Sequence, residues 1–279
     1  MGAEQFEVAI LAVGLPRTMG HAAVAASFHL IRSSLTRAGH NVSVLLWLSA
    51  TTKNGVGGHA SVDKWKRSWP LVYGPMYSAA RVWVSDETIP CNPSCRHLVG
   101  SCEANGPTFP GTMFRRYEIT GKIVLAISRL QEFERERCRS FDWVLRTRPD
   151  LLYLQPLPKL STLNPSYAYV PPGICNDGAN FNPLANDHLI LCPRGIRNCM
   201  QGELDIHRYW NCTMTWNKTD LNPANLERFV RHFNMTYTIA RAGSHGPECE
   251  RLAFPNTWSF QKRLLDLCRA YKLKWDVLE

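Results

Sequence analysis

The sequence lacks any hydrophobic run long enough to cross a membrane. No window approaches the roughly 18 uncharged apolar residues that a spanning helix needs, so no transmembrane helix is expected. The apolar stretch from Phe6 to Leu15 is short and Arg17 follows it closely, whereas a signal peptide needs a basic start and a small-residue cleavage site. We interpret this stretch as a buried strand. Membrane attachment is expected only through a targeting segment that this sequence does not contain.

Several motifs that define other protein classes are also missing. Without G-x-S-x-G an α/β-hydrolase is not expected, and without the G-K-[ST] of a P-loop the run Asn54–Gly58 is only a flexible loop. The net charge of +9 predicts attraction to anions such as nucleotide diphosphates, acidic polysaccharides, membrane surfaces or nucleic acids. Because Lys and Arg are scattered, with no long basic run, no nucleic-acid partner is expected. A basic nucleic-acid-binding protein is kept as the remotest alternative.

The composition is typical of a globular protein, with 45% hydrophobic and 20% charged residues in 279, and no internal repeat stands out. Glu7–Leu15 predicts a buried strand, and an apolar stripe from His21 to Ala38, spaced by three and four residues, predicts a helix that stops at Gly39. Val42–Leu48 predicts the next strand. Strand, helix and strand in this order predict a βαβ unit and therefore a parallel sheet.

The rest of the chain continues this alternation after an interruption. A loop-rich insertion is expected at about 50–111, with short strands at V-Y-G-P-M-Y and R-V-W-V. A long helix is expected from about Thr112 to Arg139, and its charges from Glu132 onward predict a solvated face. The later elements are a buried strand through Trp143–Leu154, strands at Tyr167–Val170, 188–193 and Met235–Ala240, and helices at about Gly195–Trp210 and Pro223–Phe233. The prediction is an α/β fold: one domain over 1–279, with a mostly parallel central sheet flanked by helices.

Cysteine is plentiful and even in number. The ten cysteines are Cys91, Cys95, Cys102, Cys138, Cys175, Cys192, Cys199, Cys212, Cys249 and Cys268. An even count suits disulfides in an oxidising compartment, with a connectivity that the sequence leaves open. A zinc knuckle built from Cys91, Cys95, Cys102 and His97 is the alternative. It lacks the paired two-residue spacings of known zinc ribbons and fingers, so disulfides are favoured.

Four N-x-S/T triplets point the same way. They begin at Asn41, Asn211, Asn217 and Asn234. Such triplets also arise by chance, and Asn41 lies close to a predicted strand. Together with the cysteines they favour the lumen of the Golgi or of another secretory compartment; a cytoplasmic or virus-encoded protein with reduced thiols is the alternative.

The segment around residues 146–150 contains the strongest functional signal. Arg146, Arg148 and Asp150 interrupt an otherwise apolar strand, and alternation places them on one face, with Pro149 stopping ladder pairing. Charges in a buried strand are costly unless they are paired or bind a ligand. Two guanidinium groups beside a carboxylate suit an oxygen-rich anion such as a diphosphate. An internal salt-bridge cluster that orders the sheet explains the pattern equally well.

The stretch Phe141–Pro158, F-D-W-V-L-R-T-R-P-D-L-L-Y-L followed by a Pro-Leu-Pro turn, resembles a set of GT-A-type glycosyltransferases from plants, algae, fungi and viruses. Two further matches are the turn Gly14–Arg17 and the Asn-Asp pair in Asn186–Leu191; a helix-opening Glu before the last strand has its nearest match at Glu227. The resemblance implies a GT-A-like (Rossmann-like) fold. It also implies transfer of a hexose or pentose from a nucleotide-sugar donor, UDP-linked, to a hydroxyl of a glycan or glycoprotein.

The resemblance also implies roles for individual residues. Asp150 would hold Mn²⁺ or Mg²⁺ against the diphosphate, or bind the ribose or sugar, although the chain has no plain Asp-x-Asp. Arg146 and Arg148 would hold this carboxylate or contact phosphate, and Arg17 would contact the nucleotide at the amino end of the first helix.

Three further candidates complete the predicted site. Asp187 is the candidate base or sugar-orienting carboxylate, Glu227 is a second catalytic candidate, and His245 is a candidate metal ligand. Each also has an ordinary explanation, as a strand-entry cap, an exposed helix residue and a loop histidine, respectively. A non-catalytic protein that binds a glycan or nucleotide on the same fold is the main alternative function.

Overall fold

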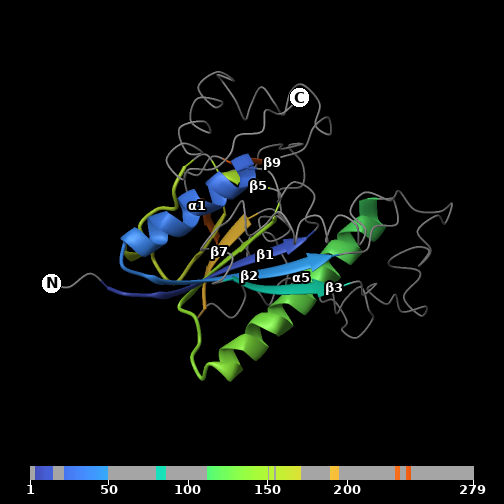
Figure 1. Ribbon diagram of the computed structural model, residues 1–279, viewed down its shortest axis with the longest axis horizontal. Helices are drawn as coiled ribbons and strands as arrows, with labels where there is room; N and C mark the ends of the chain where they lie inside the picture. The colour runs from blue at the N-terminus through green and yellow to red at the C-terminus, as the bar shows by residue number, and fades with distance from the viewer. Residues whose placement is uncertain are drawn as a thin grey trace, which may run out of the picture.

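The computed structural model describes the backbone of residues 4–14, 22–49, 80–85, 112–149, 151–153, 155–170, 189–194, 230–232 and 237–239. These residues form an α/β structure with two helices and two sheets (Figure 1). The helices are α1 (Ala22–Arg37) and α5 (Thr112–Glu136), and a 3₁₀ turn covers Leu160–Thr162. The α/β architecture predicted from the sequence is confirmed.

The central sheet has seven strands in the order β3-β2-β1-β4-β7-β6-β8. Their bounds are β1 Glu7–Gly14, β2 Asn41–Ser49, β3 Ala80–Ser85, β4 Trp143–Thr147, β6 Ala168–Val170, β7 Leu189–Pro193 and β8 Val230–His232. The strands from β3 to β4 are parallel to one another, β7 is antiparallel to both β4 and β6, and β8 is parallel to β6. Two short strands, β5 (Leu151–Tyr153) and β9 (Tyr237–Ile239), form a separate antiparallel pair.

The two helices cover opposite faces of the sheet (Figure 1). On one face Val8 and Ile10 of β1 belong to the same buried cluster as Phe28 and Ile31 of α1. On the other face the alternate residues of β1 pack with the apolar side of α5, where Leu130 is fully buried. Strands covered on both faces have apolar residues at consecutive positions, which explains the unbroken hydrophobic run of β1.

The ends of both helices have a local physical cause. After α1, Gly39 takes a positive φ of 88°, and the amide of His40 donates to the carbonyl of Leu35 at 3.2 Å, which closes the last turn. After α5, Cys138 takes a positive φ of 49°. The predicted stop at Gly39 is therefore confirmed, and the second helix ends at Glu136, three residues before the predicted Arg139.

Two predicted elements differ from the structure. The single strand predicted through Trp143–Leu154 is two strands, β4 and β5, which lie in different sheets. Pro149 has no amide hydrogen for a ladder, and the chain turns there. The helix predicted at Pro223–Phe233 is also wrong at its end, because Val230–His232 pairs with β6 as a strand. Sheet pairing overrides local helical periodicity in this segment.

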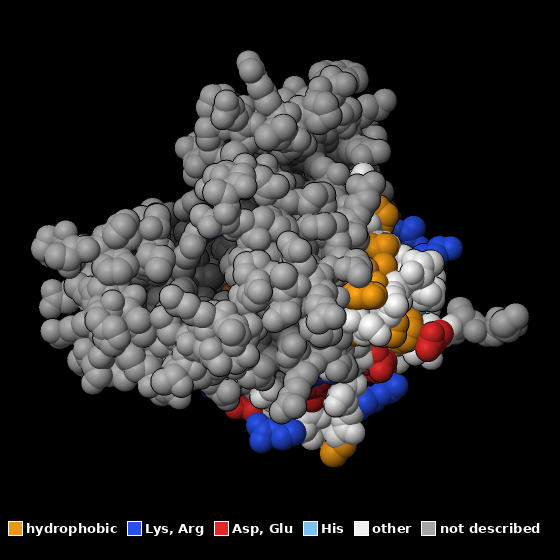
Figure 2. Space-filling model, turned by 180° about the vertical axis from the view of Figure 1, so that it is seen from behind, with side chains coloured by type: hydrophobic (Ala, Val, Ile, Leu, Met, Phe, Trp, Pro, Cys, Tyr) orange, Lys and Arg blue, Asp and Glu red, His pale blue; other side chains and the backbone are white. Residues whose placement is uncertain are grey.

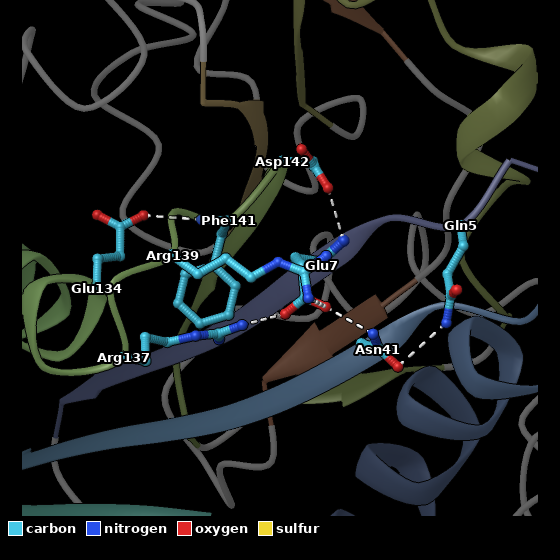
Figure 3. A network of polar contacts seen from close by, with 8 residues as sticks. All are labelled: Gln5, Glu7, Asn41, Glu134, Arg137, Arg139, Phe141 and Asp142. Carbon is cyan, nitrogen blue, oxygen red and sulfur yellow. Dashed lines mark hydrogen bonds and ion pairs between the residues drawn. The ribbon is translucent and has the colours of Figure 1, made fainter.

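A buried carboxylate joins three segments at the amino end of β1 (Figure 3). Glu7 accepts a hydrogen bond of 2.6 Å from Asn41 Nδ2, and it forms ion pairs with Arg137 and, at 3.1 Å, with Arg139. Its backbone amide donates to Asp142 Oδ2 at 2.7 Å. The start of β1 is thus tied to β2 and to the connection between α5 and β4.

A second buried carboxylate lies at the same end of the sheet. Glu134 of α5 accepts two hydrogen bonds from Arg194, at 3.0 and 2.5 Å, and one from the backbone amide of Phe141 at 3.0 Å. The predicted solvated face of this helix is therefore wrong at Glu134, which is 7% exposed. Its charge is buried against the end of β7.

The Glu7 network predicts a pH-dependent contribution to stability. Burial by itself would raise the pKa of Glu7, but hydrogen bonds from Asn41 and Arg137 and the charges of Arg137 and Arg139 outweigh it, so the pKa lies below its ordinary value of 4.5. A lowered folded-state pKa stabilises the protein above pH 4.5, and this contribution is lost as the pH falls through the folded-state value. Glu7→Gln should therefore cost about 2 kcal/mol at pH 7 and progressively less in acid, measured by urea unfolding.

Glu132→Gln is the matched control for this prediction. Its carboxylate forms an exposed ion pair with Arg129 at 2.7 Å, three residues away on the same helix. An exposed pair of this kind contributes little, so a loss below about 0.5 kcal/mol is expected. Equal losses in the two variants, or a Glu7→Gln loss that is the same at pH 7 and in acid, would contradict the prediction.

Candidate functional site

The last residue of β1 and the residues that follow β4 meet at the carboxyl edge of the central sheet. The two strands are parallel neighbours, with Ala12 opposite Thr147. Gly14, the last residue of β1, has a φ of 144°, and a Cβ atom placed on it would lie 3.2 Å from Cδ of Pro149. The absence of a side chain at Gly14 therefore permits this close approach. In open α/β sheets, ligands bind at this edge.

Most of the predicted site residues lie outside the described residues. They are Arg17, Asp150, Asp187, Glu227 and His245. Their described neighbours in the chain nevertheless show which edge of the sheet each segment joins. The structure describes Arg146 and Arg148 directly.

Connectivity relates three of these candidates to the carboxyl edge. Asp150 lies between the described Pro149 and Leu151. Arg17 is three residues after Gly14. Asp187 is two residues before Leu189, which is the register partner of Thr147.

The two remaining candidates differ in their connection to this edge. Ile239 of β9 is the register partner of Leu151, and His245 follows it by six residues, a span of at most about 20 Å. Glu227 precedes β8 by three residues. Because β8 runs in the same direction as β4, it begins at the edge of the sheet opposite the carboxyl end of β4. Glu227 therefore precedes β8 on the side away from the candidate site. The strand directions give no support for grouping Glu227 with Asp150, and its role stays a prediction.

Arg146 and Arg148 differ in burial. Arg146 is 2% exposed and is opposite Leu11 and Ile190 in the strand register, and Leu11 packs on the α5 face. Arg148 follows the strand and is half-buried. Both have interaction partners, so neither is an isolated charge. The salt-bridge and ligand-binding interpretations both apply to this pair of residues. The two arginines differ in accessibility, because only Arg148 has a surface that a ligand could reach.

Sequence reasoning missed a buried polar cluster next to this turn. The hydroxyl groups of Thr147 and Tyr153 are hydrogen-bonded to each other, and both residues are at most 1% exposed. Ser27 of α1 is also buried, with Oγ 3.3 Å from the carbonyl oxygen of Leu151 and 2.9 Å from that of Val24. The available signal was the position of Ser27 beside the apolar stripe of α1, where a hydroxyl needs a partner.

The opposite end of the sheet has a depression with a structural explanation. It encloses about 640 Å³ and is open to solvent. The lining residues are Gln131, Glu134, Arg135, Cys138, Arg139, Ser140 and Arg194. Because it surrounds the Glu134–Arg194 ion pair and lies away from the Gly14–Pro149 contact, we do not assign the site to it.

The described surface carries both signs of charge. On the face shown in Figure 2, Lys and Arg side chains lie beside Asp and Glu side chains. Within the described ranges no cluster of three metal-binding side chains occurs, and no helix is long and apolar enough to cross a membrane. The described part of this face thus shows both signs of charge.

No protein-family model matches the sequence, and no curated protein sequence matches it. Among solved structures, the galactosyltransferase LgtC in complex with donor and acceptor sugar analogues is similar at 11% identity and a TM-score of 0.36, covering 81% of this chain and 72% of LgtC. Glycosyltransferase GlyE of Streptococcus pneumoniae is similar at 12% identity and a TM-score of 0.42, covering 99% of this chain and 66% of GlyE.

The Gly14–Pro149 contact makes a testable prediction about stability. Gly14→Ala should cost about 2 kcal/mol, because it combines a backbone conformation unfavourable for alanine with a Cβ that contacts the proline ring. Gly39→Ala isolates the backbone effect, because nothing lies within 4 Å of a Cβ atom placed on Gly39. This substitution should cost about 1 kcal/mol. Urea unfolding of both variants measures the difference.

A second substitution identifies the origin of this difference. In a Pro149→Ala background the proline ring is absent, so the excess cost of Gly14→Ala over Gly39→Ala should fall to nearly zero. An unchanged excess would show that Pro149 is not the neighbour that excludes a side chain at Gly14.

Proposed function

We propose that this chain is a GT-A-type glycosyltransferase that moves a hexose or pentose from a UDP-linked donor to a hydroxyl of a glycan or glycoprotein. One observation carries the proposal: the Gly14–Pro149 approach at the carboxyl edge of parallel strands. It brings the segment that leads to Arg17 against the turn that leads to Asp150. A basic and an acidic residue close to such an edge suit a nucleotide diphosphate.

The charged residues would have different roles in donor binding, according to how deeply each is buried. Sugar transfer needs stabilisation of the negative charge that develops on the leaving diphosphate. Arg148 is half-buried, so its guanidinium would contact phosphate. Arg146 is fully buried in β4, so it would support the turn that follows this strand. Arg17 would contact the nucleotide at the amino end of the segment that enters α1.

A divalent cation fits the candidate donor set. The carboxylate of Asp150 is a hard oxygen ligand suited to Mn²⁺ or Mg²⁺, and the imidazole of His245 suits Mn²⁺. When bound, such an ion would neutralise charge on the diphosphate. In the absence of an Asp-x-Asp pair, Asp150 would be the principal protein ligand.

Deprotonation of the acceptor hydroxyl requires a base on the acceptor side. Asp187 is our candidate, because the register of Leu189 with Thr147 leads its segment toward the turn that carries Asp150. Glu227 is a second candidate on resemblance alone. A chain that binds the donor without transferring the sugar would be a glycan- or nucleotide-binding protein on the same fold.

Calorimetric titration with UDP and Mn²⁺ tests the donor site. Asp150→Asn should weaken metal-dependent UDP binding at least tenfold, because it removes the ligand charge with little change of shape. Asp142→Asn is the matched control at the other end of β4. There an asparagine oxygen can still accept the hydrogen bond from the Glu7 amide, so affinity should be unchanged.

The outcomes of this titration separate the candidate functions. Absence of UDP binding in the unmodified protein would overturn the proposal, and equal binding by Asp150→Asn would remove Asp150 from the site. Binding followed by hydrolysis of a UDP-sugar or its transfer to an acceptor identifies an enzyme. Binding with neither reaction identifies a binding protein, and salt-dependent DNA binding without UDP binding favours the nucleic-acid alternative.

We also propose a lumenal location in the secretory pathway, with the Golgi as the favoured compartment. The ten cysteines support it, and in the described part of the chain Cys192 is disulfide-bonded while Cys138 is free and exposed. Cytoplasmic or virus-encoded expression is the alternative. Glycosylation distinguishes the two.

The Asn41 side chain predicts which sequons would carry a glycan. Its Nδ2 atom, where a glycan would attach, donates to the buried Glu7 carboxylate at 2.6 Å. After expression through a eukaryotic secretory pathway, glycopeptide mass spectrometry should therefore find glycans at Asn211, Asn217 or Asn234 and none at Asn41. A glycan at Asn41 would contradict this prediction, and no glycan at any of the four would count against a lumenal location.

A further inference from the structure

We infer that the hydroxyl pair of Thr147 and Tyr153 is a clasp that positions the turn bearing Asp150, and that both are positioning residues for the donor site. The positioning role rests on the proposed function, whereas the clasp itself rests on the geometry alone. The clasp joins the last residue of β4 to the last residue of β5. The segment between them contains Arg148, Pro149 and Asp150.

The clasp connects two strands that belong to different sheets. Thr147 is held in the central sheet by its register with Ala12 and Leu189. Tyr153 is held in the small sheet by its register with Tyr237. In the described residues no backbone ladder spans the connection between these two strands. The side-chain hydrogen bond therefore fixes how far apart the two ends of the turn lie.

The tyrosine ring is fixed by contacts from α1. Phe28 packs against it edge-on, with ring centroids 5.9 Å apart and an interplanar angle of 77°. The side chain of Tyr153 is fully buried, so its hydroxyl must find a protein partner or remain unsatisfied at a high cost. Thr147 provides that partner.

The backbone on each side of Asp150 is also held. Before it, the ring of Pro149 lies against Gly14, where there is no room for a side chain without displacement. After it, the carbonyl oxygen of Leu151 lies 3.3 Å from Oγ of the buried Ser27. The clasp thus completes a frame in which β1, α1 and β4 hold the described backbone on both sides of Asp150. Catalytic and binding groups need this type of support to hold their geometry.

Tyr153→Phe tests the clasp without reference to any ligand. The substitution keeps the ring and its contact with Phe28, and it removes only the hydroxyl. Hydrogen–deuterium exchange of the peptide covering residues 147–153 should become faster, because the turn loses its side-chain closure. Tyr169→Phe is the matched control: its hydroxyl is hydrogen-bonded to the backbone of Asn164 at 2.7 and 3.0 Å, and it should leave exchange at 147–153 unchanged.

UDP titration with Mn²⁺ then tests the positioning role. Tyr153→Phe should weaken binding by about 5- to 10-fold, the range expected for loss of one buried hydrogen bond. Thr147→Val also removes the contact of Thr147 Oγ1 with the carbonyl oxygen of Arg148 at 3.4 Å, so it should weaken binding at least as much. Thr147→Ser keeps the hydroxyl and should retain most of the affinity. Tyr169→Phe should bind as the unmodified protein does.

A double-mutant cycle distinguishes positioning from general destabilisation. If the clasp acts through Asp150, Tyr153→Phe should have no further effect on residual UDP binding in an Asp150→Ala background. An equal loss in both backgrounds would overturn the positioning role. Unchanged exchange at 147–153 in Tyr153→Phe would overturn the clasp itself. Faster exchange in a protein that binds no UDP would leave the clasp in place and overturn the proposed function.

Discussion

The burial of β1 on both faces is the constraint on which the rest of this structure depends. From Val8 to Ala12 every side chain is fully buried, with α1 on one side and α5 on the other. A strand in that position must have all its polar backbone groups paired, and β2 and β4 provide this as parallel neighbours. Once three parallel strands are held together, their carboxyl ends lie on one edge. The carboxyl end of β1 and the residue Pro149 after β4 are thereby close together, as the approach of Pro149 to Gly14 shows.

The charged residues at the two ends of this sheet differ in burial and in pairing. At the amino end, the buried Glu7 carboxylate is paired with Arg137, Arg139 and the side-chain amide of Asn41. The buried Glu134 carboxylate is paired with Arg194 and the backbone amide of Phe141, so both charges are satisfied internally. Breaking such a pair leaves an uncompensated charge in a poorly solvated position, which makes these residues structural. At the carboxyl end, Arg148 is half-buried and precedes Asp150 by two residues in the sequence. If the proposed donor binds at the carboxyl end, its charge would lie away from the ion pairs that hold the amino end.

Sequence patterns predicted the elements whose burial is uniform and missed those that depend on distant partners. The apolar stripe of α1 and the continuous apolar run of β1 follow from covered faces, so both were found close to their true limits. The separation of β4 from β5 depends on which partner each strand finds, β7 and β9 respectively, and no local pattern specifies that. The strand at Val230–His232, where a helix was predicted, has the same cause. Glu134 shows where prediction of solvent exposure from a charge run fails. Its run of charges predicted an exposed helix face, but Glu134 is paired with Arg194, which is 60 residues away in the sequence.

The candidate site shows a similar division between sequence and structure. The residue types that could bind a nucleotide-sugar were recognisable, because charged side chains within an apolar strand need a reason to be there. The support for those residues was not recognisable, since Ser27, Thr147 and Tyr153 each look ordinary in their own segment. Their hydroxyl groups are buried among apolar side chains, where an unpaired hydroxyl would be destabilising. A pair of such groups that satisfy each other adds directional restraint that apolar packing alone does not provide, and this pair lies on the two strands that flank the segment with Asp150.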